Sequence, residues 1–116
     1  MRDLAVDIVP DGPAQVIRLR GELDFDRVPR LEEAFEELER SAPERVVIDL
    51  DECEFIDSSG LAAILHGADR LRQRARALRI ACPEGHLRDL LRLTAIDQTI
   101  PVVGTRSEAL SALGLD

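Results

Sequence analysis

Short apolar runs typical of strands alternate along this chain with amphipathic segments typical of helices, and this alternation constrains the fold more than any other feature. Residues 45–50 are nearly continuous in apolar side chains, as in a strand buried on both faces. The other predicted strands are residues 4–9, 14–20, 78–82 and 100–103. The predicted helices are residues 29–40, 58–76, 86–93 and 107–113. The order β-β-α-β-α-β-α-β-α predicts a single α/β domain with a mostly parallel mixed sheet of about five strands and four helices.

Local signals refine the ends of these elements. The turn residues 10–13 predict that the first two strands form an antiparallel hairpin, and Gly21 is expected to end the second strand. Asp26 is expected to cap the first helix, with Pro29 in its first turn. That helix places four apolar residues at i, i+3, i+4 and i+7: Leu31, Ala34, Phe35 and Leu38.

Length and charge exclude several functions. With 116 residues and a net charge of −8, the chain is one acidic domain that phosphate backbones and anionic lipids repel, so we expect neither a nucleic-acid nor a membrane partner. All 15 basic residues are arginine, which excludes Schiff-base chemistry and the lysine of a phosphate-binding loop. A charged N-terminus and the lack of an apolar run of ~20 residues favour a cytoplasmic protein.

The sequence gives little support for a metal site or a redox site. Cys53 and Cys82 lie far apart in the sequence without a CxxC motif or histidines at ligand spacing, so two free thiols are expected. A phospho-acceptor aspartate, as in receiver domains, lacks the lysine that such domains use. The acidic segment around residues 49–57 lacks the glycine and the final glutamate of a calcium-binding loop. We interpret its five acidic residues, which include a predicted loop at 51–54, as a solvated acidic edge: Asp49, Asp51, Glu52, Glu54 and Asp57.

Two segments follow the second and third strands, at the edge where open sheets carry their functional groups: residues 21–26 and 55–61. In the second, Asp57 or a serine can cap the helix that starts there. A cap needs one such residue, whereas two serines and Gly60 follow Asp57, and a helical glycine costs about 1 kcal/mol relative to alanine. The composition indicates a hydroxyl open to a second protein, and a helix start also suits a phosphate.

Nucleophilic serine catalysis is not supported. The segment lacks the first glycine of the G-x-S-x-G elbow. Of the two histidines, His66 lies about two turns further along the same predicted helix, and His86 is interpreted as a helix-start residue. We therefore expect no catalytic residue, metal or cofactor.

Residues 46–50 together with 55–61 resemble the signature of STAS domains, specifically bacterial anti-sigma factor antagonists. Residues 21–24 (Gly-Glu-Leu-Asp) look like the family's Gly-x-Leu-Asp, and residues 90–94 and 107–110 are similar to its C-terminal pattern. The resemblance covers nearly the whole chain and implies a single STAS domain over 1–116. Two departures lie in the last third, where Ala95 stands at a position that is often glycine and Pro101 interrupts the final strand.

The resemblance implies partner switching. An unphosphorylated antagonist of this family binds an anti-sigma factor, which has the fold of an ATP-dependent serine kinase, and the sigma factor is freed. The kinase then phosphorylates a serine at the start of the second helix, which releases the antagonist, and a serine phosphatase resets it. The resemblance implies that Ser58 of this chain is the phosphorylated residue, with Ser59 as the fallback acceptor, and that Asp24 borders the docking surface. The chain is expected to be a monomer or weak dimer.

The predicted docking surface includes an exposed, flat patch of small residues on the second helix. Its members, with the residues around the serines, are Asp24, Asp57, Ser58, Ser59, Gly60, Ala62, Ala63 and His66. An alternative hypothesis is a non-switching STAS subunit of a larger signalling or lipid-transport assembly, in which the serine only caps the helix. A third, a weak nucleotide-binding or hydrolysing enzyme, has no phosphate-binding loop to support it.

Overall fold

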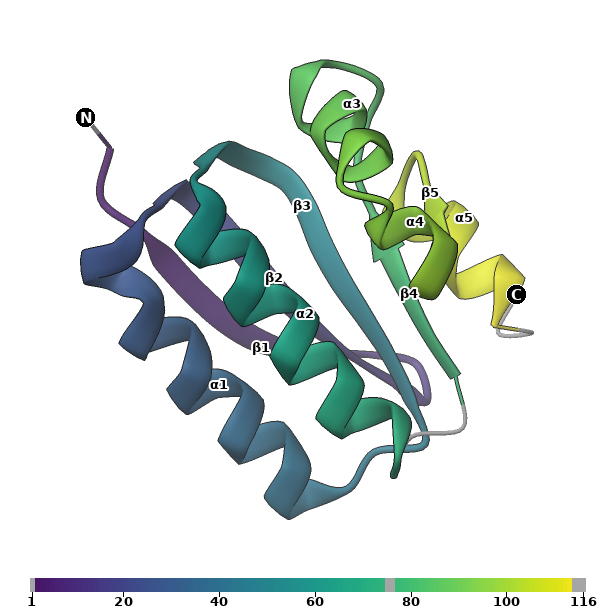
Figure 1. Ribbon diagram of the computed structural model, residues 1–116. Helices are drawn as coiled ribbons and strands as arrows, with labels where there is room; N and C mark the ends of the chain where they lie inside the picture. The colour runs from purple at the N-terminus through teal and green to yellow at the C-terminus, as the bar shows by residue number, and fades with distance from the viewer. Residues whose placement is uncertain (1, 75–76, 114–116) are drawn as a thin grey trace.

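A computed structural model describes residues 2–74 and 77–113. Within these residues five strands form one sheet in the order β1-β2-β3-β4-β5 (Figure 1). The first pair is an antiparallel hairpin and the other three pairs are parallel, so the predicted α/β fold with a mostly parallel mixed sheet is confirmed. The strands are β1 (Ala5–Asp11), β2 (Ala14–Leu23), β3 (Arg45–Ile56), β4 (Ala77–Ala81) and β5 (Val102–Val103).

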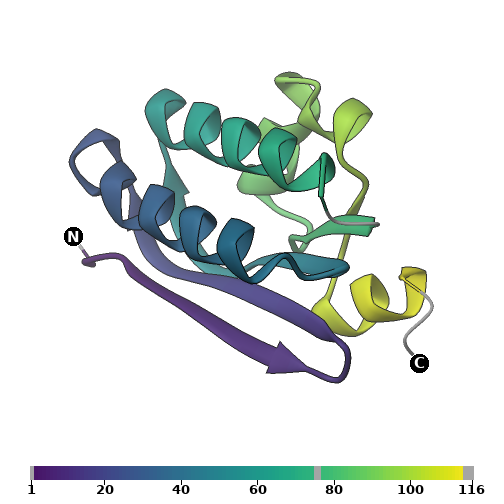
Figure 2. The same ribbon diagram turned by 90° about the horizontal axis from the view of Figure 1, so that it is seen from below.

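Helices cover both faces of the sheet. They are the 3-10 helix η1 (Phe25–Arg27), α1 (Val28–Ser41), α2 (Ser58–Arg72), α3 (His86–Leu93), α4 (Ile96–Thr99) and α5 (Arg106–Ala112). Figure 1 shows α1 and α2 side by side on one face, and Figure 2 shows α5 on the opposite face. None of the helices in the described part of the chain is long and apolar enough to cross a membrane.

The core follows from these layers. The main cluster of buried side chains lies between the sheet and α1 to α4, and it includes the predicted helical stripe of Leu31, Ala34, Phe35 and Leu38. A smaller cluster under α5 joins Val16 and Val47 to Ala109. Residues 46–50 of β3 are buried on both faces, as their sequence predicted, because helices lie on each side of this strand.

The predicted ends of β2 and β3 were wrong by three residues or more. β3 continues through the acidic residues 51–54 to Ile56, because backbone pairing with β2 continues while most of these side chains face solvent. Gly21 does not end β2, which runs to Leu23. Instead, the pairing of β2 with β3 shifts in register between Arg18 and Arg20 and between Gly21 and Glu22. Gly21 has φ +102°, and a Cβ there would collide with the carbonyl oxygen of Asp3, so glycine is needed for the N-terminal segment to pass close by.

Several helix ends also differ. α2 ends at Arg72, before the predicted end, and residues 75–76 lie outside the described residues. Asp26 is not a cap. Asp24 caps η1, and Arg27 precedes α1 without a side-chain cap. Pro29 does lie in the first turn of α1.

The last third contains an element that periodicity did not predict. The short helix α4 starts after Ala95, which adopts the left-handed conformation (φ +59°) that glycine accommodates most easily. The final strand is only Val102–Val103, because Pro101 lacks the N–H that strand pairing needs. α5 starts one residue earlier than predicted, and Thr105 caps it.

Candidate functional site

Asp57 caps α2 and joins it to the end of β2. Its Oδ1 accepts a hydrogen bond from the backbone N–H of Gly60 (2.8 Å), which satisfies a free donor of the first helical turn. Its Oδ2 accepts from the backbone N–H of Phe25 (3.0 Å), in η1. The predicted segments after β2 and β3 therefore meet at one edge of the sheet, as the parallel arrangement requires.

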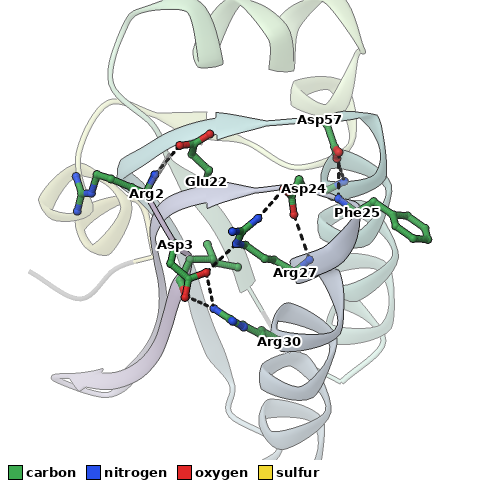
Figure 3. A network of polar contacts seen from close by, with 10 residues as sticks. Arg2, Asp3, Glu22, Asp24, Phe25, Arg27, Arg30 and Asp57 are labelled. Carbon is green, nitrogen blue, oxygen red and sulfur yellow. Dashed lines mark hydrogen bonds and ion pairs between the residues drawn. The ribbon is translucent and has the colours of Figure 1, made fainter.

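Asp24 fixes the other side of this edge (Figure 3). Its Oδ1 accepts from the backbone N–H of Arg27 (3.2 Å), and its Oδ2 accepts from Arg27 Nη1 (2.6 Å). Arg27 Nε donates to Asp3 (2.7 Å), which also accepts from Arg30 Nη1 (3.0 Å). The N-terminal segment, η1 and α1 are thus connected by one chain of charged side chains.

Charge holds Asp3 in its ionised form. The hydrogen bonds from Arg27 and, next, from Arg30 lower the pKa of Asp3 from 3.8 to about 2, because both arginines favour the carboxylate. Arg2 adds two contacts from the same segment, since its backbone N–H donates to Glu22 (2.7 Å) and its side chain pairs with Glu54 (2.6 Å). The start of the chain therefore contacts β2, β3, η1 and α1.

Ser58 is the first residue of α2 and is exposed, and Ser59 is half-buried. Because Asp57 is the cap, the helix does not depend on either serine side chain for its start. Within residues 2–74 and 77–113 the Ser58 hydroxyl makes no hydrogen bond to protein. The arrangement leaves an accessible hydroxyl at a helix start, next to the Asp57 carboxylate.

The predicted docking patch is only partly exposed. Ala62 and His66 face solvent as expected, but Ala63 is 8% exposed and belongs to the core, so its placement on the patch was wrong. Gly60 is also buried, and a Cβ on it would lie 2.7 Å from Leu23 Cγ. The glycine therefore allows α2 to pack closely on the sheet, and it does not serve to expose a neighbouring hydroxyl. Positions 60 and 63 share the inner face because they are nearly one helical turn apart.

The prediction of a solvated acidic edge was also only partly correct. Asp51, Glu52 and Glu54 are exposed, but Asp49 is 4% exposed. Its Oδ2 accepts from Arg106 Nε at 3.0 Å, which ties β3 to α5. No cluster of three or more potential metal ligands occurs in the residues that the structure describes.

Both cysteines are free, as predicted, and both are buried in the core. Burial raises the pKa of Cys53 to about 11 and also raises the pKa of Cys82, because a thiolate is poorly solvated in the core. These thiols are therefore protonated at neutral pH.

Sequence reasoning did not single out Phe25. This residue follows Asp24 directly, and its side chain is 72% exposed. The available signal was its position, because a large apolar residue that lies outside every predicted helix stripe and directly after a strand has no partner in the core.

The mixed α/β sheet carries at its carboxyl edge an exposed serine, on a helix that an aspartate already caps, and this arrangement favours a domain that binds other proteins. The model of a family described as "Mlab, STAS domain" matches residues 7–104. The chain belongs to the STAS-domain family.

The chain is similar to anti-sigma factor antagonists over nearly its full length. Anti-sigma-F factor antagonist RsfB of Mycobacterium tuberculosis is 26% identical over 110 residues, which cover 95% of this chain and 89% of that protein. The crystal structure of an anti-sigma factor antagonist from Mycobacterium paratuberculosis superposes with a TM-score of 0.87 at 26% identity, covering 95% and 93% of the two chains.

A third relative shows the shared fold. The anti-sigma factor antagonist SpoIIAA in its unphosphorylated form matches with a TM-score of 0.68 at 21% identity over 96% of this chain and 97% of that one. The predicted STAS fold is confirmed by these superpositions. At the level of the family, the expectation of a regulatory protein rather than an enzyme is confirmed as well.

Proposed function

We propose that this chain is an anti-sigma factor antagonist that is switched by phosphorylation of Ser58. In this proposal the unphosphorylated chain binds an anti-sigma factor with a serine-kinase fold in the cytoplasm, and the sigma factor is freed. Phosphorylation releases the antagonist and a serine phosphatase restores it. Ser59 is the fallback acceptor.

The observation that carries the proposal is the exposed hydroxyl of Ser58 beside a complete cap. Asp57 already accepts the N–H of Gly60 at 2.8 Å, so capping does not account for the serine. A kinase can reach the Ser58 side chain without opening the helix, because that side chain faces solvent. The relative SpoIIAA supports the same chemistry, since its fold also matches in a form described as phosphorylated, with a TM-score of 0.68 at 20% identity.

Electrostatics explains how such a phosphate releases a partner. A phosphoserine adds nearly two negative charges at neutral pH, next to the Asp57 carboxylate and on the same edge as Asp24. When a second protein binds there, it removes water from these charges, and their mutual repulsion is then less screened. Two like charges ~4 Å apart repel by about 4 kcal/mol at an effective dielectric constant of ~20. A loss of ~3 kcal/mol already weakens binding by roughly a hundredfold.

Affinity capture from the source cells tests the proposal. Wild type and Ser58→Ala are used as bait beside Ser58→Asp, and captured proteins are identified by mass spectrometry. We expect the first two to retain a protein with a serine-kinase fold and Ser58→Asp to lose it. Ser107→Asp is the matched control, because it adds the same charge at an exposed serine in the first turn of α5, away from this edge, and it should retain the protein.

Phosphosite mapping on the protein isolated from growing and stressed cells completes this test. Phosphate on Ser58 that changes with condition supports the switch. Equal capture of the kinase-fold protein by Ser58→Ala and Ser58→Asp would contradict the charge mechanism. Phosphate found only on Ser59 would transfer the role to the fallback residue.

One observation keeps a second candidate function. The description of the matching family model, "Mlab, STAS domain", names a STAS domain and no sigma-factor antagonist, so a non-switching STAS subunit of a larger signalling or lipid-transport assembly remains the alternative. In that case the chain would co-purify with a membrane or very large complex, and neither serine would carry phosphate under any condition.

A further inference from the structure

Phe25 is an exposed aromatic residue beside the proposed phosphorylation site. Among the described residues three large apolar side chains are exposed, namely Phe25 (72%), Phe55 (44%) and Leu93 (83%). Of these, only Phe25 hydrogen-bonds through its backbone to the cap of α2, since its N–H donates to Asp57. Its ring therefore lies on the same edge of the sheet as Ser58.

The surrounding structure holds this ring outward. The backbone N–H of Phe25 donates to Asp57 Oδ2 at 3.0 Å, and Asp24 holds the next turn through the N–H of Arg27 at 3.2 Å. η1 contains no buried residue, so the segment has no contact with the core that would draw the ring inward. In Figure 3 the ring points away from the polar network that fixes its backbone.

The neighbours of the ring define what fits there. Asp26, the next residue, is exposed, and Asp57 lies on the other side. A complementary surface therefore offers an apolar pocket for the ring and a basic side chain at the rim that faces Asp26.

We propose that Phe25 is the apolar anchor by which this chain docks into a pocket of its kinase-fold partner. This inference rests on the proposed function and adds the residue that supplies binding energy. An aromatic held rigidly at a surface loses little conformational freedom on binding, and buried aromatics are frequent hot spots of interfaces. Ser58 then lies at the rim of an apolar contact, where a phosphate has to be dehydrated, and docking of the anchor becomes sensitive to phosphorylation.

Binding measurements with the purified kinase-fold protein that the wild-type chain captures test the anchor. We expect Phe25→Ala to weaken the Kd by about thirtyfold or more, and Phe25→Leu to stay within about fivefold of wild type because it retains apolar volume. Leu93→Ala is the matched control, since it removes a large apolar side chain of α3 that is at least as exposed as Phe25, and it should leave the Kd unchanged. Thermal unfolding of each variant should match wild type, because the removed atoms are exposed.

Ser58→Asp in the same titrations separates the two proposals. If Phe25→Ala binds within about threefold of wild type while Ser58→Asp does not bind, the anchor is refuted and the switch stands. If Phe25→Ala loses affinity and Ser58→Asp binds like wild type, the anchor stands and the switch is refuted. Equal losses in Phe25→Ala and Leu93→Ala would also refute the anchor, because they would reflect general surface apolarity.

Discussion

Asp57 Oδ2 accepts a hydrogen bond from the backbone N–H of Phe25 at 3.0 Å, although the two residues are 32 positions apart in the chain. The same carboxylate caps α2 through the N–H of Gly60. One side chain thus fixes the start of the serine-bearing helix relative to the segment after β2. The proposed docking residues on both segments are therefore held in place before any partner binds.

Replacing Asp57 should loosen this edge. Asp57→Ala removes both acceptors and should lower the free energy of unfolding by about 1–2 kcal/mol, measured by urea denaturation. Asp57→Asn keeps one acceptor oxygen and should lose about half as much. Asp26→Ala is the control, because this exposed aspartate does not cap either helix. Equal stability of Asp57→Ala and wild type would show that the two bonds contribute nothing net.

Gly60→Ala tests whether glycine is needed for packing. A Cβ at this position would lie 2.7 Å from Leu23 Cγ and 2.9 Å from Ile56 Cγ2, so α2 or the sheet must shift. We expect a net loss of about 1–2 kcal/mol in urea denaturation even though alanine favours helix by about 1 kcal/mol. Ser59→Ala, one residue earlier, should leave stability unchanged or slightly higher. A Gly60→Ala protein as stable as wild type would instead indicate that α2 moves freely at this end.

The low pKa of the Asp3 carboxyl predicts that part of the free energy of unfolding is lost in acid. Its folded pKa of about 2 lies below the ordinary value of 3.8, so the unfolded chain takes up the proton first as pH falls. The stabilisation is fully present above about pH 4 and is lost as pH falls towards 2. Asp3→Asn should therefore be less stable than wild type at pH 5, and the difference should shrink between pH 4 and pH 2. A difference that is constant with pH in urea denaturation would contradict the role of the carboxylate charge.

Asp49 should matter to the packing of α5. Asp49→Ala leaves Arg106 without the carboxylate that it contacts at 3.0 Å, and it opens space in a buried position. We expect a loss of about 2–3 kcal/mol, together with faster hydrogen exchange in α5. Asp51→Ala is the control, because this side chain is exposed and its removal should change stability by less than about 0.5 kcal/mol. Unchanged exchange in α5 would mean that the apolar cluster with Ala109 and the Arg106–Asp11 ion pair (3.5 Å) hold this helix without Asp49.

Particular elements show why sequence reasoning succeeded or failed. The alternation of apolar runs predicted the sheet and α1 correctly because burial follows periodicity. It failed at residues 51–54, since a strand can continue with polar side chains when its backbone pairs with a neighbour. It also failed at Ala63, because the inner face of α2 is set by where Gly60 lets the helix approach the sheet.

The sequence by itself determined the order of the five strands and the four longer helices, the two segments at the carboxyl ends of β2 and β3, and the presence of a serine pair after Asp57, because these depend on local pattern and on a recognisable motif. Only the tertiary structure decided that Asp57 rather than a serine caps α2, that Asp24 and Arg27 join the N-terminal segment to this edge, and that Phe25 points outward. The physical reason is that hydrogen bonds and burial between residues tens of positions apart depend on how β2, β3 and α2 pack, and no local pattern encodes that geometry.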